Sequence, residues 1–507
     1  MKLFASACLI ALLAPGRILG ADASPDLAAL RIRAEQGEAS AQVELGASYR
    51  TGSGVAADPD QARRWFLRAA GQNNALAQYN LGVMSEHGDA VAQDRREAAR
   101  WYRLAATQGL AAAQFNLGSL YAEGFGVTRD PVEAAKWYRL AAEQGDADAQ
   151  YNLGALYGNG TGVEKDMTQA RQWFRLAAEQ GRAVADFSLA EIYSRGDGVP
   201  PDHAEAARWY LRAAQLGSLA AQKRLGEIYA RGDGVPASGT EAALWWRKAA
   251  EQGDGIAQYN LGALYARGDG VPRDSVEAVR WYQRAAAQEV AEAQANLGLM
   301  YARGDGVPRD SAEAVRWYQR AAALGVAEAQ VNLGLMYARG DGVPKNPAEA
   351  AGWYRQAAGL GSAEAATNLG LLYAQGEGVP QDYAQAMEWY RRAAEQGYAR
   401  AQHNLGVLCA TGRGLAKDPR EASRWFLAAA EQGYIPSMHN LGLALLDRPG
   451  RERDLVQACA WLTVAGELGS AVSRKILADI TPEMNAGQIA AADTQAQKIR
   501  GKLPAKP

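Results

Sequence analysis

The chain has 507 residues, enough for about three ordinary domains, and its 48% hydrophobic and 22% charged residues are typical of a folded globular protein. The formal net charge of −2 gives no electrostatic reason to expect nucleic acid or an anionic membrane as a partner. Alanine and glycine are abundant, whereas phenylalanine is scarce (7 residues), which favours closely packed helices over strands.

The N-terminal segment has the features of a secretory signal peptide. Lys2 precedes an apolar run over residues 3–14, Pro15-Gly16 interrupts it, and small residues follow at 21–23. We therefore expect a signal peptide over residues 1–23, cleaved after Gly20, Ala21 or Ala23, and a periplasmic or secreted protein. The run is too short for a transmembrane helix, which needs about 20 residues, and no other segment approaches that length.

Only two cysteines, Cys409 and Cys459, lie outside the expected signal peptide. A secreted disulfide scaffold needs many more, so we expect packing to hold the fold together. The interpretation that we favour is two small buried helix residues, and a single bridge between them is the alternative.

Tryptophan reveals a strict internal repeat, because twelve of the thirteen tryptophans follow one another at intervals of 36 residues. A Leu-Gly pair stands twenty residues before each of them, with Leu189-Ala190 as the variant. The twelve tryptophans are Trp65, Trp101, Trp137, Trp173, Trp209, Trp245, Trp281, Trp317, Trp353, Trp389, Trp425 and Trp461.

One unit of this repeat predicts a first helix over residues 111–123, with apolar or small residues at i, i+3, i+4 and i+7. Gly118 in its middle would cost about 1 kcal/mol against alanine if it were exposed. Its recurrence in other units predicts that a neighbouring helix backbone passes too close for a Cβ. Glycines at 124 and 126 then end the helix.

A second helix is predicted to begin at Asp130 as its N-cap, with Glu133 closing a capping box. All twelve units carry Asp, Asn or Ser at this cap and Glu or Gln three residues later. The residues expected on its inner, buried face are Ala134, Trp137, Tyr138 and Ala141. A single hairpin of this kind cannot bury its own apolar face, so each must pack on its neighbours.

The pattern A-x-A-Q-x-N-L-G-x-x-Y, G-x-G-V, D-x-x-x-A-x-x-W-Y/F-x-x-A-A-x-x-G resembles the Sel-1-like repeat, a relative of the tetratricopeptide repeat. The resemblance covers Gly37 to about Leu468 and weakens in the last unit, where Arg448-Pro449-Gly450 replaces the loop glycines and Leu462 the second aromatic residue. It implies an all-α, right-handed superhelical α-solenoid of twelve 36-residue helix–loop–helix repeats over 37–468. We expect a capping helix over 24–36, and capping helices with a loose tail over 469–507.

The sequence shows no constellation typical of an enzyme, so we predict no catalytic residue and no cofactor. His403 and His439 occupy equivalent positions in adjacent units, but adjacent helices lie about 10 Å apart and no third metal ligand is evident. We therefore predict no metal site and expect ordinary surface histidines.

Arg303-Gly304-Asp305 has the letters of a cell-adhesion ligand, and its acidic residue beside glycine also suggests a metal loop. The position of Asp305 is variable, however, and other units carry Ser, Phe, Thr or Arg there. We interpret the tripeptide as the joint between two helices, in which the arginine alone is a candidate functional residue.

By analogy with tetratricopeptide arrays, the first helices are expected to line a concave groove. An aromatic residue stands two positions before the conserved leucine in several of the earlier units, and it suggests either a binding surface for an apolar peptide or rings packed between units. These residues are Tyr79, Phe115, Tyr151, Phe187 and Tyr259.

Six positions after the leucine, five consecutive units carry arginine. The row suggests either a basic ladder for carboxylates or cations that favour a helix C-terminus. These residues are Arg195, Arg231, Arg267, Arg303 and Arg339.

The resemblance implies a non-enzymatic scaffold of the bacterial cell envelope that binds a partner protein or peptide through this groove. The alternative is a protein that binds an acidic polysaccharide in export or wall remodelling. A third interpretation is β-lactam hydrolysis, because a cysteine-rich secreted branch of the resembled family has been linked to β-lactam binding or breakdown, but the paired cysteines of that branch are missing here.

Overall fold

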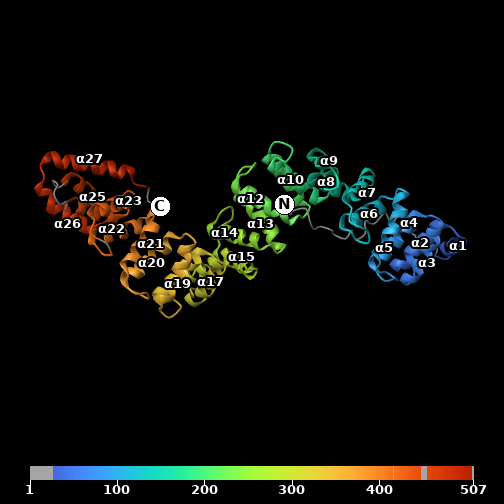
Figure 1. Cartoon of the computed structure of the whole chain (residues 1–507), viewed down its shortest axis with the longest axis horizontal. Helices are drawn as coiled ribbons and strands as arrows, with labels where there is room; N and C mark the ends of the chain where they lie inside the picture. The colour runs from blue at the N-terminus through green and yellow to red at the C-terminus, as the bar shows by residue number, and fades with distance from the viewer. Residues whose placement is uncertain (1–26, 415, 447–453, 505–507) are drawn as a thin grey trace. The chain divides into compact units, whose positions relative to one another are not determined.

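The computed structural model describes residues 27–414, 416–446 and 454–504, and all regular secondary structure in these ranges is helical (Figure 1). Contacts divide the chain into two compact units, Met1–Gln252 and Gly253–Pro507. The expected signal peptide and the loop with Arg448-Pro449-Gly450 lie outside the described residues. Within the described ranges, no helix has the length and apolar character that a membrane span requires.

The helices of the first unit are α1 (Leu27–Glu35), α2 (Ala39–Thr51), α3 (Pro59–Gly71), α4 (Ala75–His87), α5 (Arg95–Thr107), α6 (Ala111–Glu123), α7 (Pro131–Glu143), α8 (Ala147–Asn159), α9 (Met167–Glu179), α10 (Ala183–Arg195), α11 (His203–Gln215), α12 (Leu219–Arg231) and α13 (Gly239–Glu251).

The helices of the second unit are α14 (Gly255–Arg267), α15 (Ser275–Ala287), α16 (Ala291–Arg303), α17 (Ser311–Ala323), α18 (Ala327–Arg339), α19 (Pro347–Gly359), α20 (Ala363–Gln375), α21 (Tyr383–Glu395), α22 (Ala399–Thr411), α23 (Pro419–Ala430), α24 (Ile435–Leu446), α25 (Leu455–Glu467), α26 (Ala471–Ile480) and α27 (Ala486–Lys502), with a 3₁₀ turn at Thr481–Glu483.

From α2 to α25 the helices alternate, so that each even-numbered helix is the first and each following odd-numbered helix the second of a repeat. Within each unit the two helices of a repeat pack together, and the second also packs on the first helix of the next repeat. The predicted all-α array of twelve helix–loop–helix repeats is thus confirmed. The residues expected on the inner face of α7 are all buried: Ala134, Trp137, Tyr138 and Ala141.

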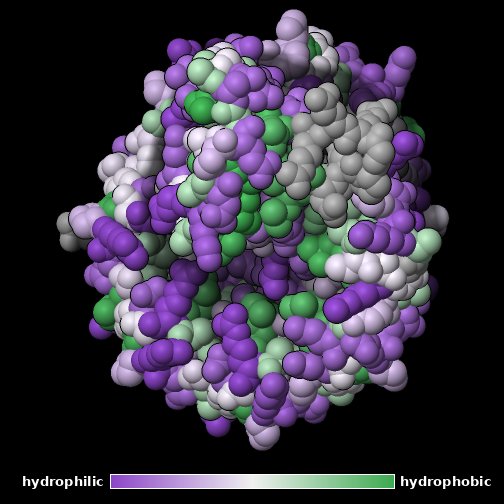
Figure 2. All heavy atoms as spheres, turned by 90° about the vertical axis from the view of Figure 1, so that its left-hand side faces the viewer, coloured by the Kyte–Doolittle hydropathy of each residue, from purple (hydrophilic) through white to green (hydrophobic). Residues whose placement is uncertain are grey.

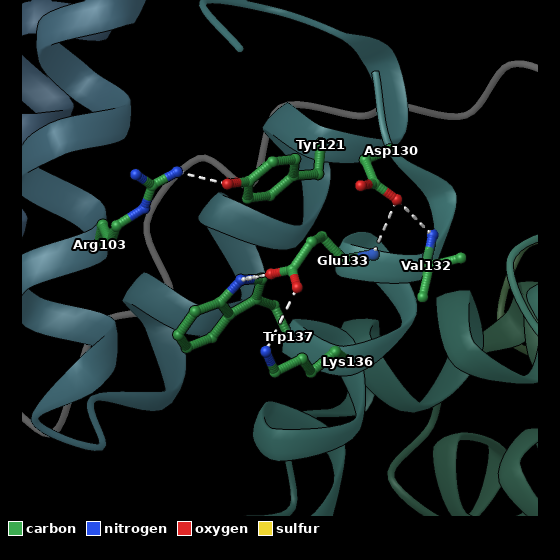
Figure 3. Close-up of polar contacts among 7 residues, drawn as sticks. All are labelled: Arg103, Tyr121, Asp130, Val132, Glu133, Lys136 and Trp137. Carbon is green, nitrogen blue, oxygen red and sulfur yellow. Dashed lines mark hydrogen bonds and ion pairs between the residues drawn. The ribbon is translucent and has the colours of Figure 1, made fainter. Parts of the chain in front are cut away.

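Figure 3 shows how the second helix of one repeat begins. The Asp130 carboxylate accepts hydrogen bonds from the backbone N–H groups of Val132 (2.9 Å) and Glu133 (3.1 Å), as expected of an N-cap. The Arg103 guanidinium of α5 donates to the hydroxyl of Tyr121 in α6, so a polar contact also joins the preceding repeat to this one.

The predicted capping box is wrong in its second half. The Glu133 carboxylate does not return to the N-cap but accepts from Trp137 Nε1 (3.1 Å) and Lys136 Nζ (3.2 Å) (Figure 3). The backbone N–H of Asp130 donates instead to the carbonyl of Tyr121, 2.9 Å away at the end of the first helix. Because this donor is already satisfied, the glutamate is available to hold the tryptophan.

The glycine in the middle of the first helix lies closest to an aromatic ring, and in several repeats the expected helix backbone is also near: a Cβ on Gly154 would lie 3.1 Å from the carbonyl oxygen of Ala170. A Cβ added to Gly118 would lie 2.9 Å from Cδ1 of Tyr138, and one added to Gly334 would lie 2.5 Å from Cε1 of Tyr354. Real Cβ atoms do not approach so closely, so the glycine makes room for the aromatic residue that follows the tryptophan. In the last repeat Leu462 takes this place, 2.6 Å from a Cβ on Gly442.

The loop glycines join each repeat to the one before it. Gly304 and Gly306 have φ angles of +80° and +72°, which residues with a side chain rarely adopt. A Cβ on Gly306 would lie 2.2 Å from the carbonyl oxygen of Ser275, in the first turn of α15. The interpretation of Arg303-Gly304-Asp305 as a structural joint agrees with this geometry.

A buried glutamine ties three helices together in many repeats. Gln114 of α6 is only 4% exposed; its Nε2 donates to the carbonyl of Ala106 in α5 (3.1 Å), and its Oε1 accepts from Nε2 of Gln144 after α7 (2.7 Å). Gln402 makes the equivalent pair of bonds in the second unit. These bonds satisfy the buried amide and fix the second helix of one repeat against both helices of the next.

Asp186 of α10 replaces this glutamine and is fully buried. Its Oδ1 lies 3.3 Å from Nε of Arg212, and Arg212 itself donates to the carbonyl of Ala178, the acceptor that a glutamine would use. Leu216 stands where other repeats have the second glutamine. Burial raises the pKa of Asp186 to about 6, although the Arg212 guanidinium acts in the opposite direction.

At the C-terminal end, α25 packs against both α26 and α27. Cys409 of α22 and Cys459 of α25 are both buried and unbridged, which confirms the favoured interpretation of the two cysteines. The Cys459 thiol lies 3.1 Å from the Met484 sulfur.

The glycine–ring contact predicts opposite effects for two glycine-to-alanine changes in one repeat. Gly334→Ala should destabilise α18 and α19 by about 1–3 kcal/mol, because its Cβ would overlap the buried ring of Tyr354. The control Gly352→Ala lies in α19, where a Cβ meets nothing within 4 Å, and should stabilise the repeat by about 1 kcal/mol. Hydrogen exchange at the amides of the two helices measures both effects; shifts of the same sign would contradict the contact.

The raised pKa of Asp186 predicts that the stability of the fold depends on pH. Its folded-state pKa of about 6 lies above the ordinary value of 3.8, so the folded state takes up a proton between pH 7.5 and 4.5 that the unfolded chain does not. The stability of the unmodified protein should therefore rise by about 2 kcal/mol relative to that of Asp186→Asn as the pH falls through this window. Urea unfolding of both proteins at several pH values measures the difference, and parallel pH profiles would show that Asp186 is ionised as freely in the fold as outside it.

Candidate partner-binding face

The first helices of neighbouring repeats lie side by side, as the hydrogen bond from Arg400 Nη1 of α22 to Asn368 Oδ1 of α20 (3.3 Å) shows. On each first helix, the positions i, i+4, i+7 and i+11 point in nearly one direction, because eleven residues return to within about 20° of the starting direction. These positions are exposed or half-buried in α16, whereas the residues between them are mostly buried. We call the surface formed by these four positions of each first helix the first-helix face.

On α16, α18 and α20 of the second unit this face carries opposite charges at its two edges, whereas the next first helix, α22, has Arg400 at the first position. Glutamate occupies the first position in three consecutive helices, and arginine occupies the last position in two of them. Glutamate near a helix N-terminus and arginine near a C-terminus both favour the helix dipole. The stripes are Glu292, Asn296, Leu299 and Arg303 in α16; Glu328, Asn332, Leu335 and Arg339 in α18; and Glu364, Asn368, Leu371 and Gln375 in α20.

The glutamates were missed in the sequence, although their distance from the arginines, eleven residues, is the signal that places both on one face. The arginines recur at one position of consecutive repeats, whereas the glutamates stand out only when positions along one helix are compared. Glu292 and Arg303 lie about 16 Å apart along the helix axis.

Charges at both edges of the first-helix face affect the pKa values of tyrosines on the second helices. Burial raises the pKa of Tyr354 to about 12; Arg339 lowers it and Glu364 raises it. Burial also raises the pKa of Tyr318, with Glu328 acting in the same direction and Arg303 in the opposite one. The hydroxyls of these buried rings therefore lie within electrostatic reach of the charges on the first-helix face.

The five predicted arginines each end a first helix and are exposed. Arg195 and Arg231 belong to the first unit, and the other three to the second. Arg195 forms an ion pair with Glu191, and Arg267 Nε lies 2.6 Å from Asp269 Oδ2. Across the ranges that the structure describes, neither Arg303 nor Arg339 has an ion pair or a hydrogen bond. Whether the row binds carboxylates stays a prediction.

The five predicted aromatic residues are half-buried, and each ring packs against the aromatic residue of the second helix in its own repeat. The ring centroids lie 5.5–5.9 Å apart in every pair. Around the helix axis, these positions lie about 60° away from the first-helix face. The pairs are Tyr79–Tyr102, Phe115–Tyr138, Tyr151–Phe174, Phe187–Tyr210 and Tyr259–Tyr282. Packing between helices thus accounts for part of each ring, and a role in partner binding stays a prediction.

The histidines differ from the ordinary surface histidines that we expected, because both are half-buried between helices. His403 Nδ1 lies 2.9 Å from Ser437 Oγ, and His439 Nδ1 lies 2.9 Å from Ser473 Oγ, one repeat further on. Burial lowers the pKa of His403 to about 4. In the part of the chain that the structure describes, no three His, Cys, Asp or Glu side chains group as metal ligands would.

Figure 2 looks onto the end of the molecule that carries the last helices. Hydrophilic residues cover most of this surface, and hydrophobic residues gather in its middle.

Comparison with known proteins gives a consistent result. The Sel1 repeat is matched at residues 39–74, 75–110, 111–146, 147–181, 183–218, 219–254, 255–290, 291–326, 327–362, 363–398, 399–434 and 435–470. No curated protein matches the chain.

Two solved structures share the repeat and more than a third of their residues with this chain. A protective antigen present in uropathogenic Escherichia coli strains, which displays an SLR fold, is 36% identical, with coverage of 94% of this chain and 95% of its own and a TM-score of 0.75. A Sel1 repeat protein from Oxalobacter formigenes is 39% identical and covers 48% of this chain and 99% of its own, with a TM-score of 0.42. With twelve matched repeats and a relative that is similar over nearly its whole length, the chain belongs to the Sel1 repeat family.

Proposed function

We propose that the chain is a non-enzymatic scaffold of the bacterial cell envelope that binds a partner protein through its first-helix face. Sel1 repeat arrays generally mediate protein–protein interaction. The observation that carries the proposal is the recurrence of one four-position stripe on consecutive first helices, with its outer positions exposed and its middle positions mostly half-buried, which gives a partner a continuous row of contacts within a unit.

The mixed charge of the face favours a protein partner over an acidic polysaccharide. A polyanion would gain from Arg303 and Arg339 but would be repelled by the glutamates on the same helices. A protein segment can present both signs of charge and so complement the two edges together.

The envelope location rests on the N-terminal segment, with Lys2, the apolar run over residues 3–14 and the small residues at 21–23. A signal peptide would direct the chain to the compartment in which we propose that the repeats act.

Capture of a partner from the envelope fraction tests the binding role. The immobilised protein should retain a partner at a constant stoichiometry, and Arg303→Glu/Arg339→Glu should reduce capture at least tenfold, because it reverses the charge at one edge of the first-helix face. The control Arg280→Glu/Arg316→Glu makes the same change on second helices, where both arginines are exposed, and should leave capture unchanged. Equal loss with both variants, or no retained partner, would count against binding through the first-helix face.

Cell fractionation tests the location. The protein should be recovered from the periplasm or medium with a new N-terminus between residues 21 and 24, as measured by mass spectrometry of its N-terminal peptide. Leu9→Arg/Leu12→Arg should leave the uncleaved chain inside the cell, because two charges interrupt the apolar run, whereas Leu9→Ile/Leu12→Ile should be exported normally. Recovery of the unmodified chain inside the cell with residues 1–23 intact would refute the envelope assignment.

A further inference from the structure

The charges on the first-helix face of α16, α18 and α20 have no ion pair, whereas an arginine on each of the neighbouring second helices α15 and α17 is paired. Arg280 and Arg316 of the second helices lie 3.1 Å from Glu277 and 2.8 Å from Glu313. By contrast, Glu292, Glu328 and Glu364 have no ion pair or hydrogen bond with any residue that the structure describes, and the same holds for Arg303 and Arg339. One edge of the face therefore offers unpaired negative charge and the opposite edge unpaired positive charge.

Between these two edges runs a less polar strip. Leu299, Leu335 and Leu371 occupy the third stripe position and are half-buried. Asn368, at the second position, is only 6% exposed; its Oδ1 accepts from Arg400, while its Nδ2 finds no acceptor among the described residues. The middle of the face is thus mostly apolar, and Asn368 is buried beneath it against the next first helix.

From this arrangement we infer that the first-helix face of α16, α18 and α20 binds an amphipathic α-helix of a partner protein that carries acidic residues along one flank and basic residues along the other. The inference rests on the proposed function and adds the kind of partner. Its apolar side would lie over the three leucines, its acidic flank over Arg303 and Arg339, and its basic flank over the glutamates.

The dimensions of the face fit a helix. The charged edges lie about 16 Å apart along each first helix, and a helix with its side chains is about 10–12 Å wide, so its flanking charges reach both edges. Neighbouring packed helices lie about 8–10 Å apart, and seven residues of an α-helix rise by about 10.5 Å. A charge repeated every seven residues on each flank would therefore meet one first helix after another.

Three synthetic 21-residue helices test the inference on the full chain. They share one leucine-containing apolar side and differ in their flanks: acidic and basic, both acidic, or both basic, each charge repeated every seven residues. Fluorescence anisotropy at low salt should show that the unmodified protein binds the mixed peptide roughly tenfold more tightly than either other peptide, as expected from two or three exposed charge pairs. The preference should shrink as salt is raised.

A charge reversal supplies the matched control. Arg303→Glu/Arg339→Glu makes both edges acidic, so its preference should move to the peptide with two basic flanks, with circular dichroism showing an unchanged helix content. Glu328→Lys/Glu364→Lys should prefer the peptide with two acidic flanks. No binding of any peptide at 100 µM-scale concentration, roughly the weak end of useful peptide affinity, or equal binding of all three would overturn the inference.

The outcome can be separated from that of the proposed function. If an envelope protein is captured but its binding is lost only with the arginine variant and not with Glu328→Lys/Glu364→Lys, the scaffold function stands and the two-edged recognition fails. If the mixed peptide binds as expected but no envelope protein is captured, the recognition stands and the scaffold function fails.

Discussion

The fold depends on the contact between the mid-helix glycine of most first helices and the aromatic ring after the tryptophan of the second; the exceptions are Ala190 in α10 and Leu462 in the last repeat. In repeat after repeat a Cβ on that glycine would lie under 3 Å from the ring, for example 2.7 Å at Gly298 and Tyr318 and 2.8 Å at Gly370 and Tyr390. The missing side chain lets the two helices approach, and the ring fills the space between them. Because the contact fixes how each first helix is turned, it also decides which of its residues face outward. The same tyrosines bring their hydroxyls within reach of the charges on the first-helix face.

Much of this fold could be predicted from the sequence because its signals are local and recur in phase. The spacing of the tryptophans specifies the length of the repeat, and the loop glycines and cap residues specify where helices end and begin. The structure has its helix ends at these positions. What the sequence could not show is the partner of a recurring residue. Gly118 predicted a close neighbour but not that the neighbour is the ring of Tyr138, and Glu133 matched a capping box although the N–H of Asp130 is satisfied by the carbonyl of Tyr121. The buried glutamines were overlooked for the same reason, since their acceptors lie on other helices.

The candidate site was predicted only in part. The arginine column emerged because identical residues stand at one position of consecutive repeats, and comparing repeats finds such columns. The opposing glutamates emerge only when positions are compared along one helix, where eleven residues amount to about three turns. The aromatic column was visible, but the sequence could not show how much of each ring is used in packing against its own second helix. The share of each ring that is buried depends on the distance between the two helices, which the mid-helix glycines determine.

Leaving charges unpaired on this face is a property of the sequence and not a requirement of the fold. In α10 the same architecture carries Glu191 one turn before Arg195, and the two form an ion pair while Glu191 also accepts from the Tyr210 hydroxyl. In α16 and α18 a leucine occupies that position, so the terminal arginine has no partner in its own helix. Exposed ion pairs contribute little to stability, and charges at helix ends already interact favourably with the helix dipole. A repeat can therefore lose the ion pair and keep an unpaired charge at small cost to the stability of the fold. The four stripe positions can therefore change the charge of the face while the glycine–ring contact and the glutamine bridges keep the helices in place.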